Sequence, residues 1–269
     1  PWLGRDPALP NPVIIVPGIM GSYLNRESNN QEVWMSIPEM LVSITDVYLD
    51  DLMLSPEGYQ ISDRSFIATN IIKDTGPNDF FNSLISTLET TGYGVDVDLF
   101  TFPYDWRLDI SVVTSELKEK IDEIKAQTGA EKIDLIAHSM GGLLVKEYLK
   151  QYGGNSIDKF IDVGTPHSGS PKALKILGYG DNIGASILYG LFGLNTQKVK
   201  EISQNMPAVY QLLPSQKYFN DTGYYVLDMT NGNNRYDFEQ TKDYLKSQGR
   251  NSILVDRADE FHQEIDNLD

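Results

Sequence analysis

The stretch IDLIAHSMGGLLVKEYLK, residues 133–150, joins two apolar patterns of different period. Ile133–Ala137 is a short apolar run typical of a buried strand, whereas the apolar positions in Leu143–Leu149 repeat at helical spacing. Between them, Ala137-His138-Ser139-Met140-Gly141 matches the G-x-S-x-G elbow of strand–turn–helix hydrolases, with alanine for the first glycine. We predict that Ser139 is a nucleophile at the end of a strand. A serine that merely caps the following helix is the alternative.

Strand-like and helix-like segments alternate along the chain on both sides of this stretch. The expected strands are Val13–Val16, Val95–Leu99, Ile133–Ala137 and Lys159–Val163. Helices are expected to begin at Asn78 and Ser111 and after Ser139, each followed by a glycine. This alternation predicts an α/β fold with a mostly parallel sheet and helices on both faces.

Two segments break this alternation, at about residues 32–60 and 171–215. Both are rich in apolar residues and are interpreted as helical insertions into one domain that spans residues 1–269. They form either additional core or a lid or cap with an apolar docking surface.

Composition excludes several classes of function. The chain has 269 residues, 22 of them basic and 38 acidic, for a formal charge of −16, which disfavours a nucleic-acid partner. It contains no cysteine, so disulfides and thiolate catalysis are excluded, while the cytoplasm and secretion are both compatible with the sequence. We expect no cofactor and no metal site.

An oxyanion hole requires backbone N–H groups near the nucleophile. The Met140 N–H lies at the expected helix N-terminus, where it can face a developing oxyanion. The glycine-bearing segment Pro17–Ser22 follows the first strand, which makes the Ile19 N–H the second expected donor. A plain tight turn is the alternative for this segment.

Three histidines are candidates for the general base. His138 lies inside the elbow and is expected to pack with its ring away from Ser139, and His167 is interpreted as pocket wall or local structure. His262 comes late enough in the chain to be a base, with Asp228 as its acid. However, the spacing of its neighbours predicts an exposed histidine on a helix.

Several blocks together resemble the lecithin:cholesterol acyltransferase family of α/β-hydrolases, which includes lysosomal phospholipases and bacterial lipases. The blocks are Val16–Ser22, Pro103–Arg107, Ala137–Gly142, Gly164–Ser170 and Leu212–Ser215. The Tyr-Asp-Trp-Arg sequence within Pro103–Arg107 is the most discriminating. In it we expect Trp106 to be core and Asp105 and Arg107 to form a structural ion pair.

The resemblance implies an α/β-hydrolase fold and an acyl-enzyme on Ser139, with Ile19 and Met140 as oxyanion donors. It places Trp34-Met35 in a membrane-facing or lid insertion. It also implies an acid in a Gly-Asp-Gly-like block and a later histidine. No such block occurs, so the acid and base are expected beyond Asp269, in a chain that continues.

The expected function is a serine acyl hydrolase or acyltransferase acting on lipid esters, at a membrane or lipoprotein-like surface. Two alternatives stay open: an amidase or lipid-anchor deacylase on the same fold, and a non-catalytic lipid-binding module. The sequence does not indicate the oligomeric state.

Overall fold

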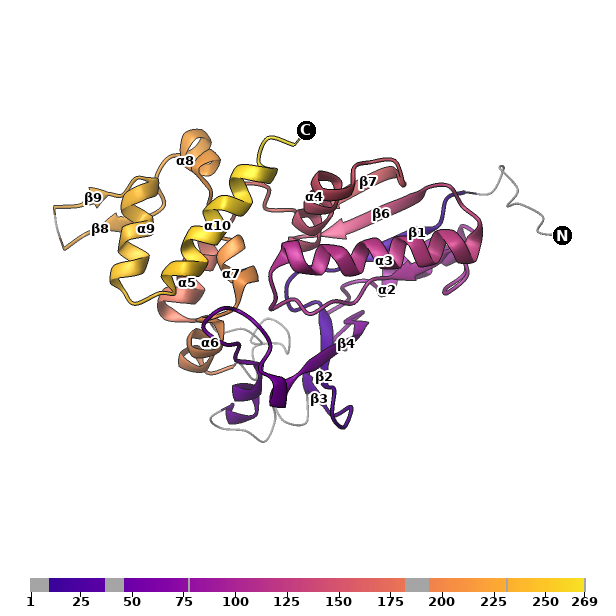
Figure 1. The fold of residues 1–269 in the computed structure, drawn as a ribbon, viewed down its shortest axis with the longest axis horizontal. Coiled ribbons are helices and arrows are strands. Elements are labelled where there is room, and N and C mark those ends of the chain that lie inside the picture. Colours follow the sequence, from indigo (N-terminus) through magenta and orange to yellow (C-terminus); the bar gives the residue numbers. More distant parts are fainter. Residues whose placement is uncertain (1–9, 37–45, 77, 182–193, 231, 269) are drawn as a thin grey trace. The chain divides into compact units, whose positions relative to one another are not determined.

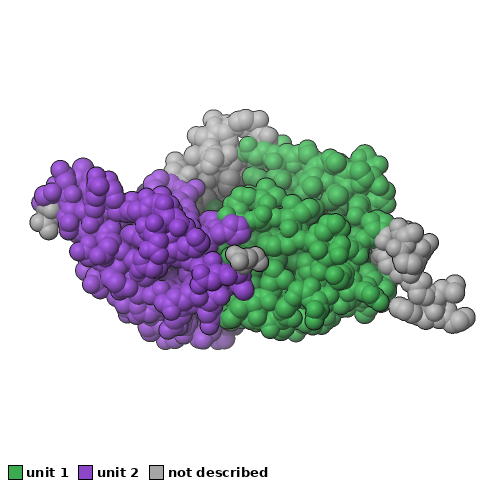
Figure 2. All heavy atoms as spheres, turned by 90° about the horizontal axis from the view of Figure 1, so that it is seen from above, with its two compact units in different colours: residues 1–25, 67–106, 110–165 green, residues 26–66, 107–109, 166–269 purple. Residues whose placement is uncertain are grey.

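The computed structural model describes residues 10–36, 46–76, 78–181, 194–230 and 232–268. Contacts divide the chain into two compact units, which Figure 2 colours separately. Unit 1 comprises residues 1–25, 67–106 and 110–165, and unit 2 comprises residues 26–66, 107–109 and 166–269. The predicted organisation as one domain with two insertions stays a prediction.

A parallel sheet forms the centre of unit 1 (Figure 1). Its strands pair in the order β5-β1-β6-β7, namely β5 (Leu99–Thr101), β1 (Val13–Val16), β6 (Ile133–His138) and β7 (Ile157–Val163). The strands predicted at residues 13–16, 133–137 and 159–163 are confirmed. Val16 aligns with Ala137. The carboxyl ends of β1 and β6 therefore lie side by side, and the segments that follow them meet at one edge of the sheet.

The described residues of unit 1 include the helices α2 (Asn82–Thr90), α3 (Ile110–Thr128) and α4 (Met140–Tyr152). Ile85 of α2 packs with Phe81 against Val13, Ile15 and Leu99 on one face of the sheet. Alternate residues of a strand point to opposite faces, so Ile14 and Val16 point to the other face, where they are fully buried. Helix α3 packs against α4 (Figure 1). Strands β2 (Ser22–Arg26) and β4 (Phe66–Ile71) pair in a separate sheet.

The strand predicted at residues 95–99 is wrong except at its last residue. Val95 and Val97 are 40% and 66% exposed, because residues 94–98 form a turn in which the Gly94 N–H donates to Asp98 Oδ1 over 2.7 Å. Asp96 has a φ of 61°, which is incompatible with a strand. The alternation of valine and aspartate therefore reflects a turn closed by an aspartate side chain.

The predicted cap at Asn78 is also wrong, because α2 begins four residues later at Asn82. The Asn78 carbonyl accepts a hydrogen bond from the Thr75 N–H (3.0 Å) instead. Asp79 takes over the capping role, since its carboxylate accepts the Ser83 N–H at 3.0 Å.

Unit 2 is mostly helical. Its helices are α5 (Pro171–Tyr179), α6 (Thr196–Ser203), α7 (Pro207–Gln211), α8 (Gln216–Thr222), α9 (Phe238–Ser247) and α10 (Ser252–Ile265). It also contains the short strands β3 (Glu32–Trp34), β8 (Leu227–Asp228) and β9 (Asn234–Arg235) and the 3₁₀ helices η1 (Val47–Leu52) and η2 (Ser62–Arg64). No helix in the part of the chain that the structure describes is long and apolar enough to cross a membrane.

The two predicted insertions differ in structure. Residues 171–215 contain α5, α6 and α7, which confirms the helical prediction for the described part, while residues 182–193 lie outside it. The described part of residues 32–60 holds β3 and the 3₁₀ helix η1 rather than an α-helix, and residues 37–45 lie outside the description. Trp34 and Met35 are buried, at 2% and 3% exposed. Their place in a membrane-facing or lid insertion stays a prediction. A lid or cap role for either insertion stays a prediction.

Candidate active site

Ser139 occupies the turn between β6 and α4 in a strained backbone conformation. Its φ of 53° and ψ of −125° lie in a region that L-residues rarely adopt. The backbone is fixed on both sides, because the Ser139 N–H donates to the Val163 carbonyl (2.9 Å) and the Ser139 carbonyl accepts the Gly142 N–H (3.0 Å). The side chain is partly exposed, and its hydroxyl has no hydrogen-bond partner among the described residues. The turn therefore presents a free hydroxyl on a fixed backbone.

The small residues around Ser139 are required by close contacts, as predicted. A Cβ on Gly141 would lie 2.5 Å from the Pro17 carbonyl oxygen, and one on Gly142 would lie 1.9 Å from Thr165 Oγ1. Ala137 is fully buried. These contacts explain the pattern better than a capping serine, because the Ser139 side chain makes no capping hydrogen bond to α4.

The segment Pro17–Ser22 lies directly against Ser139. A Cβ on Gly18 would be 2.8 Å from Ser139 Cβ and 3.3 Å from Ser139 Oγ. The Gly21 N–H donates to the Gly18 carbonyl (3.0 Å), and Met20 has a φ of 61°, so residues 18–21 form a tight turn. The predicted turn and the predicted proximity to the nucleophile are thus compatible with each other.

Two backbone N–H groups near Ser139 are available to an oxyanion. The Ile19 N–H has no acceptor among the described residues. Met140 is the first residue of α4, and the first N–H groups of a helix lack intrahelical acceptors. A negatively charged oxygen at this place would also be stabilised by the helix dipole. The assignment of both groups as oxyanion donors stays a prediction that this geometry supports.

The block Tyr104-Asp105-Trp106-Arg107 has a structural role that its sequence does not reveal. Tyr104 and Trp106 are 1% and 3% exposed, which confirms Trp106 as core. The Tyr104 hydroxyl donates to the Pro17 carbonyl (2.9 Å), and Trp106 Nε1 donates to the Ser22 carbonyl (3.2 Å). Both ends of the Pro17–Ser22 segment are therefore bound by this block.

Arg107 is fully buried within unit 2. Its guanidinium donates to the Leu52 carbonyl (3.1 Å) and to Gln60 Oε1 (3.4 Å), and it lies 4.7 Å from the centre of the Phe66 ring. These contacts assign Arg107 to the packing of its own unit. The ion pair with Asp105 stays a prediction.

The structure does not assign the role of general base to His138 or to His167. His138 is exposed and contacts Phe81 edge-on, with ring centroids 6.2 Å apart. Its predicted packing with the ring away from Ser139 stays a prediction. Desolvation lowers the pKa of its imidazole. His167 is exposed. Its role as pocket wall or local structure stays a prediction.

The prediction of an exposed His262 is wrong. The residue does lie on a helix, α10, but it is only 3% exposed. Nδ1 contacts Asp266 Oδ1 and Nε2 contacts the Gln211 carbonyl oxygen, both at 2.9 Å. The amphipathic spacing of Phe261 and Ile265 does not reveal this burial. The histidine is covered by α7, in which Gln211 lies 51 residues earlier in the chain.

Asp228, the candidate acid for His262, is bound elsewhere. Its carboxylate accepts the Thr230 N–H (2.9 Å), the Thr230 hydroxyl (2.7 Å) and the Tyr236 hydroxyl (2.9 Å). His262 makes hydrogen bonds to Asp266 and Gln211 instead. The structure therefore does not join Asp228 and His262 into an acid–base pair.

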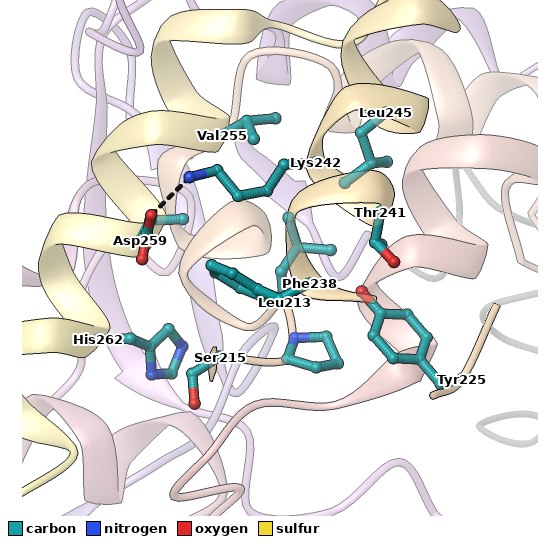
Figure 3. A pocket seen from close by; sticks show the side chains of 12 residues that line it. Leu213, Ser215, Tyr225, Phe238, Thr241, Lys242, Leu245, Val255, Asp259 and His262 are labelled. Carbon is teal, nitrogen blue, oxygen red and sulfur yellow. Dashed lines mark hydrogen bonds and ion pairs between the residues drawn. The ribbon is translucent and has the colours of Figure 1, made fainter. Parts of the chain in front are cut away.

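The cavity beside His262 is too small for a lipid. It has a volume of about 20 Å³, and Lys242 and Asp259 form an ion pair of 2.5 Å at its wall (Figure 3). Such a volume holds about one water molecule. Among the described residues, no group of three or more His, Cys, Asp or Glu side chains is arranged to hold a metal ion.

Within unit 2, residues 166–170 of the block Gly164–Ser170 pair with the block Leu212–Ser215. The Ser170 N–H donates to the Leu212 carbonyl (2.7 Å), and the Ser215 N–H donates to the Ser168 carbonyl (3.0 Å). A Cβ on Gly169, whose φ is 87°, would lie 2.2 Å from the Leu213 carbonyl oxygen. The blocks Gly164–Ser170 and Leu212–Ser215 are therefore joined through their backbones.

Comparison with known proteins identifies the family that these sequence blocks resemble. The family model described as lecithin:cholesterol acyltransferase matches residues 31–265. The phosphatidylcholine-sterol acyltransferase of Mus musculus is 27% identical over 246 residues, covering 78% of this chain and 56% of the relative. The lysosomal phospholipase A and acyltransferase of Homo sapiens is 26% identical over 250 residues, covering 78% and 59%. The chain thus spans little more than half the length of these relatives.

A solved structure supports the fold. A chain in the crystal structure of the Tle4–Tli4 complex superimposes with a TM-score of 0.59 at 16% identity, covering 95% of this chain and 72% of that chain. Together with the parallel sheet and its flanking helices, this likeness confirms the predicted α/β-hydrolase fold. The Pro17–Ser22 segment precedes the residues that the family model matches.

Proposed function

Since the chain belongs to the lecithin:cholesterol acyltransferase family, we propose that it is a serine acyl hydrolase or acyltransferase that acts on lipid esters. The observation that carries this proposal is the turn at Ser139, which presents a free hydroxyl on a strained backbone. The Pro17–Ser22 segment lies in contact with this turn. Relatives named as a phosphatidylcholine-sterol acyltransferase and as a lysosomal phospholipase A and acyltransferase support lipid esters as the substrate class.

In this mechanism Ser139 Oγ attacks the ester carbonyl carbon while its proton passes to a general base. The carbonyl oxygen becomes an oxyanion, which the Ile19 and Met140 N–H groups stabilise, a contribution of about 10²–10³-fold in rate for one donor. The intermediate collapses, the alcohol part of the lipid leaves with a proton, and an acyl-enzyme ester remains on Ser139. Water or an acceptor alcohol then attacks this ester and restores the serine.

The general base and its acid are not assigned to residues of this chain. His262 and Asp228, the candidates within it, each have other hydrogen-bond partners. The assignment of an acid and a base stays a prediction, as does action at a membrane or lipoprotein-like surface.

The full-length protein and a fluorophosphonate probe test this proposal. We expect the probe to form a covalent adduct that peptide mapping locates on Ser139. Ser168→Ala is the matched control, because it removes another loop serine without touching the turn after β6, and it should label at the wild-type rate. A protein that is folded but takes up no probe would be a non-catalytic binding module, and the proposal would be wrong.

Phosphatidylcholine vesicles then test the substrate class. We expect release of free fatty acid, and transfer of the acyl group when a long-chain alcohol is included. N-acyl substrates offered in competition distinguish the amidase alternative. Preferred cleavage of the amide over the ester would contradict a lipid-ester enzyme while leaving Ser139 as the nucleophile.

A further inference from the structure

The Pro17–Ser22 segment is bound at its first and its last residue by one other segment, Tyr104–Trp106. We infer that Tyr104 and Trp106 are positioning residues that aim the Ile19 N–H at the reacting carbonyl. This inference rests on the proposed function, and it gives a role to two residues of the Tyr104-Asp105-Trp106-Arg107 block. All these residues belong to unit 1.

The first attachment is the Tyr104 hydroxyl, which donates to the Pro17 carbonyl oxygen over 2.9 Å. Tyr104 is 1% exposed, so water does not replace the bond if it is lost. Burial raises the pKa of the hydroxyl well above its ordinary range. The group therefore remains a protonated donor at neutral pH.

The second attachment involves Ser22, which is fully buried. Its carbonyl oxygen accepts Trp106 Nε1–H (3.2 Å), and its hydroxyl oxygen accepts the Tyr104 N–H (3.1 Å). Two residues of the block thus hold the end of the segment where β2 begins.

Between these attachments the backbone has a conformation that needs external support. Gly18 has no side chain to restrict rotation, and Met20 has a positive φ of 61°. The Gly18 carbonyl accepts the Gly21 N–H (3.0 Å), which fixes the peptide plane between Gly18 and Ile19. In a trans peptide the N–H points opposite to the carbonyl. The direction of the Ile19 N–H therefore follows from the turn, and the position of the turn follows from Pro17 and Ser22.

If Tyr104 had only a structural role through its ring, Tyr104→Phe would behave like the wild type. Its ring stacks on Phe102, with centroids 5.8 Å apart, and a phenylalanine at position 104 would keep this stack. Only the bond to Pro17 would be lost. Tyr104→Phe thus separates positioning through the hydroxyl from packing by the ring.

The decisive experiment compares Tyr104→Phe with Tyr148→Phe in the full-length protein. Tyr148 is likewise 1% exposed and lies in unit 1, on α4, where its ring contacts Tyr152. With a soluble ester as substrate, we expect Tyr104→Phe to lower kcat by about 10–100-fold with KM within about twofold, since misplaced donors weaken transition-state binding specifically. Labelling of Ser139 by the fluorophosphonate should slow by a similar factor. Tyr148→Phe should leave both rates near those of the wild type.

Amide hydrogen exchange provides a readout that does not depend on activity. We expect exchange at residues 18–21 to be faster in Tyr104→Phe than in the wild type, and unchanged in Tyr148→Phe. Wild-type kcat together with wild-type exchange in Tyr104→Phe would overturn the inference, and so would equal losses of kcat in both variants. If the wild-type protein itself neither turns over nor labels, the proposed function fails, which is distinct from an active wild type with an equally active Tyr104→Phe.

Discussion

Hydrogen bonds hold both Ser139 and His262, but they bind the backbone of Ser139 and the side chain of His262. In Ser139 the backbone N–H and carbonyl are bound while the hydroxyl has no partner among the described residues. In His262 both ring nitrogens are bound, to Asp266 and to the Gln211 carbonyl, and the side chain is 3% exposed. A side chain without a hydrogen-bond partner on a fixed backbone is available to react. A side chain whose polar atoms are all hydrogen-bonded contributes to stability instead. The two residue types alone do not reveal this difference.

The largest expected effect is on turnover by Ser139→Ala. Without the nucleophile, ester turnover of the full-length protein should fall by about 10⁴-fold or more. The free energy of unfolding should change by less than about 0.5 kcal/mol, because no hydrogen bond of the described protein is lost. Steady-state kinetics and urea unfolding measure the two quantities. A variant that keeps most of its turnover would mean that Ser139 is not the nucleophile.

His262→Leu should give the opposite result. The substitution leaves the Gln211 carbonyl and the Asp266 carboxylate without their imidazole partner, at a cost of about 2–4 kcal/mol in the free energy of unfolding. Labelling of Ser139 per folded molecule should stay at the wild-type rate. Gln263→Leu, at the next and exposed position of α10, is the matched control and should change the unfolding free energy by less than about 0.5 kcal/mol. Loss of labelling in folded His262→Leu would instead identify His262 as the base.

Ser139→Gly tests the strain of the turn. Glycine adopts a φ of 53° more easily than serine or alanine does, so part of the strain should be released. We expect Ser139→Gly to be more stable than Ser139→Ala by about 1 kcal/mol, after the greater freedom of glycine in the unfolded chain is subtracted. Urea unfolding of the two variants under identical conditions gives the difference. Lower stability of the glycine variant would show that the turn is not strained.

The smallest expected effect concerns His138. Because desolvation lowers the pKa of its imidazole in the folded protein, the unfolded chain binds this proton more readily. Its contribution therefore favours folding above the pKa of the unfolded state and is lost as the pH falls through it. An NMR titration should give His138 a midpoint below the ordinary value for histidine. A midpoint at or above that value would contradict the desolvated environment.

Local patterns predicted the parts of the fold that depend on neighbouring residues. The strand at Val13–Val16 and the helix over residues 110–128 were correctly expected, because an apolar run and a helical stripe directly reflect burial. The alternation at residues 95–98 misled, because Asp98 closes a turn by binding the Gly94 N–H. Periodicity does not distinguish an exposed turn from a strand when polar and apolar residues alternate in both.

The candidate site shows the same limit on a longer scale. The requirement for small residues around Ser139 was predicted, since the sharp turn itself imposes it. The bond from Tyr104 to Pro17 links residues 87 positions apart, and no spacing rule connects them. The burial of His262 likewise depends on the distant Gln211 carbonyl. Contacts between segments that are distant in the sequence decide which polar residues have a structural role. Such contacts could not be predicted from the sequence.

The contact between Gly142 and Thr165 has a consequence for how this chain can vary. The threonine hydroxyl fills the place where a side chain at position 142 would begin, since a Cβ there would be 1.9 Å from Thr165 Oγ1. The two positions therefore share a single volume close to Ser139. Gly142→Ala should be poorly tolerated alone and better tolerated together with Thr165→Gly, so that the two substitutions compensate each other. Among natural variants, a larger residue at position 142 is then expected to occur with a smaller one at position 165.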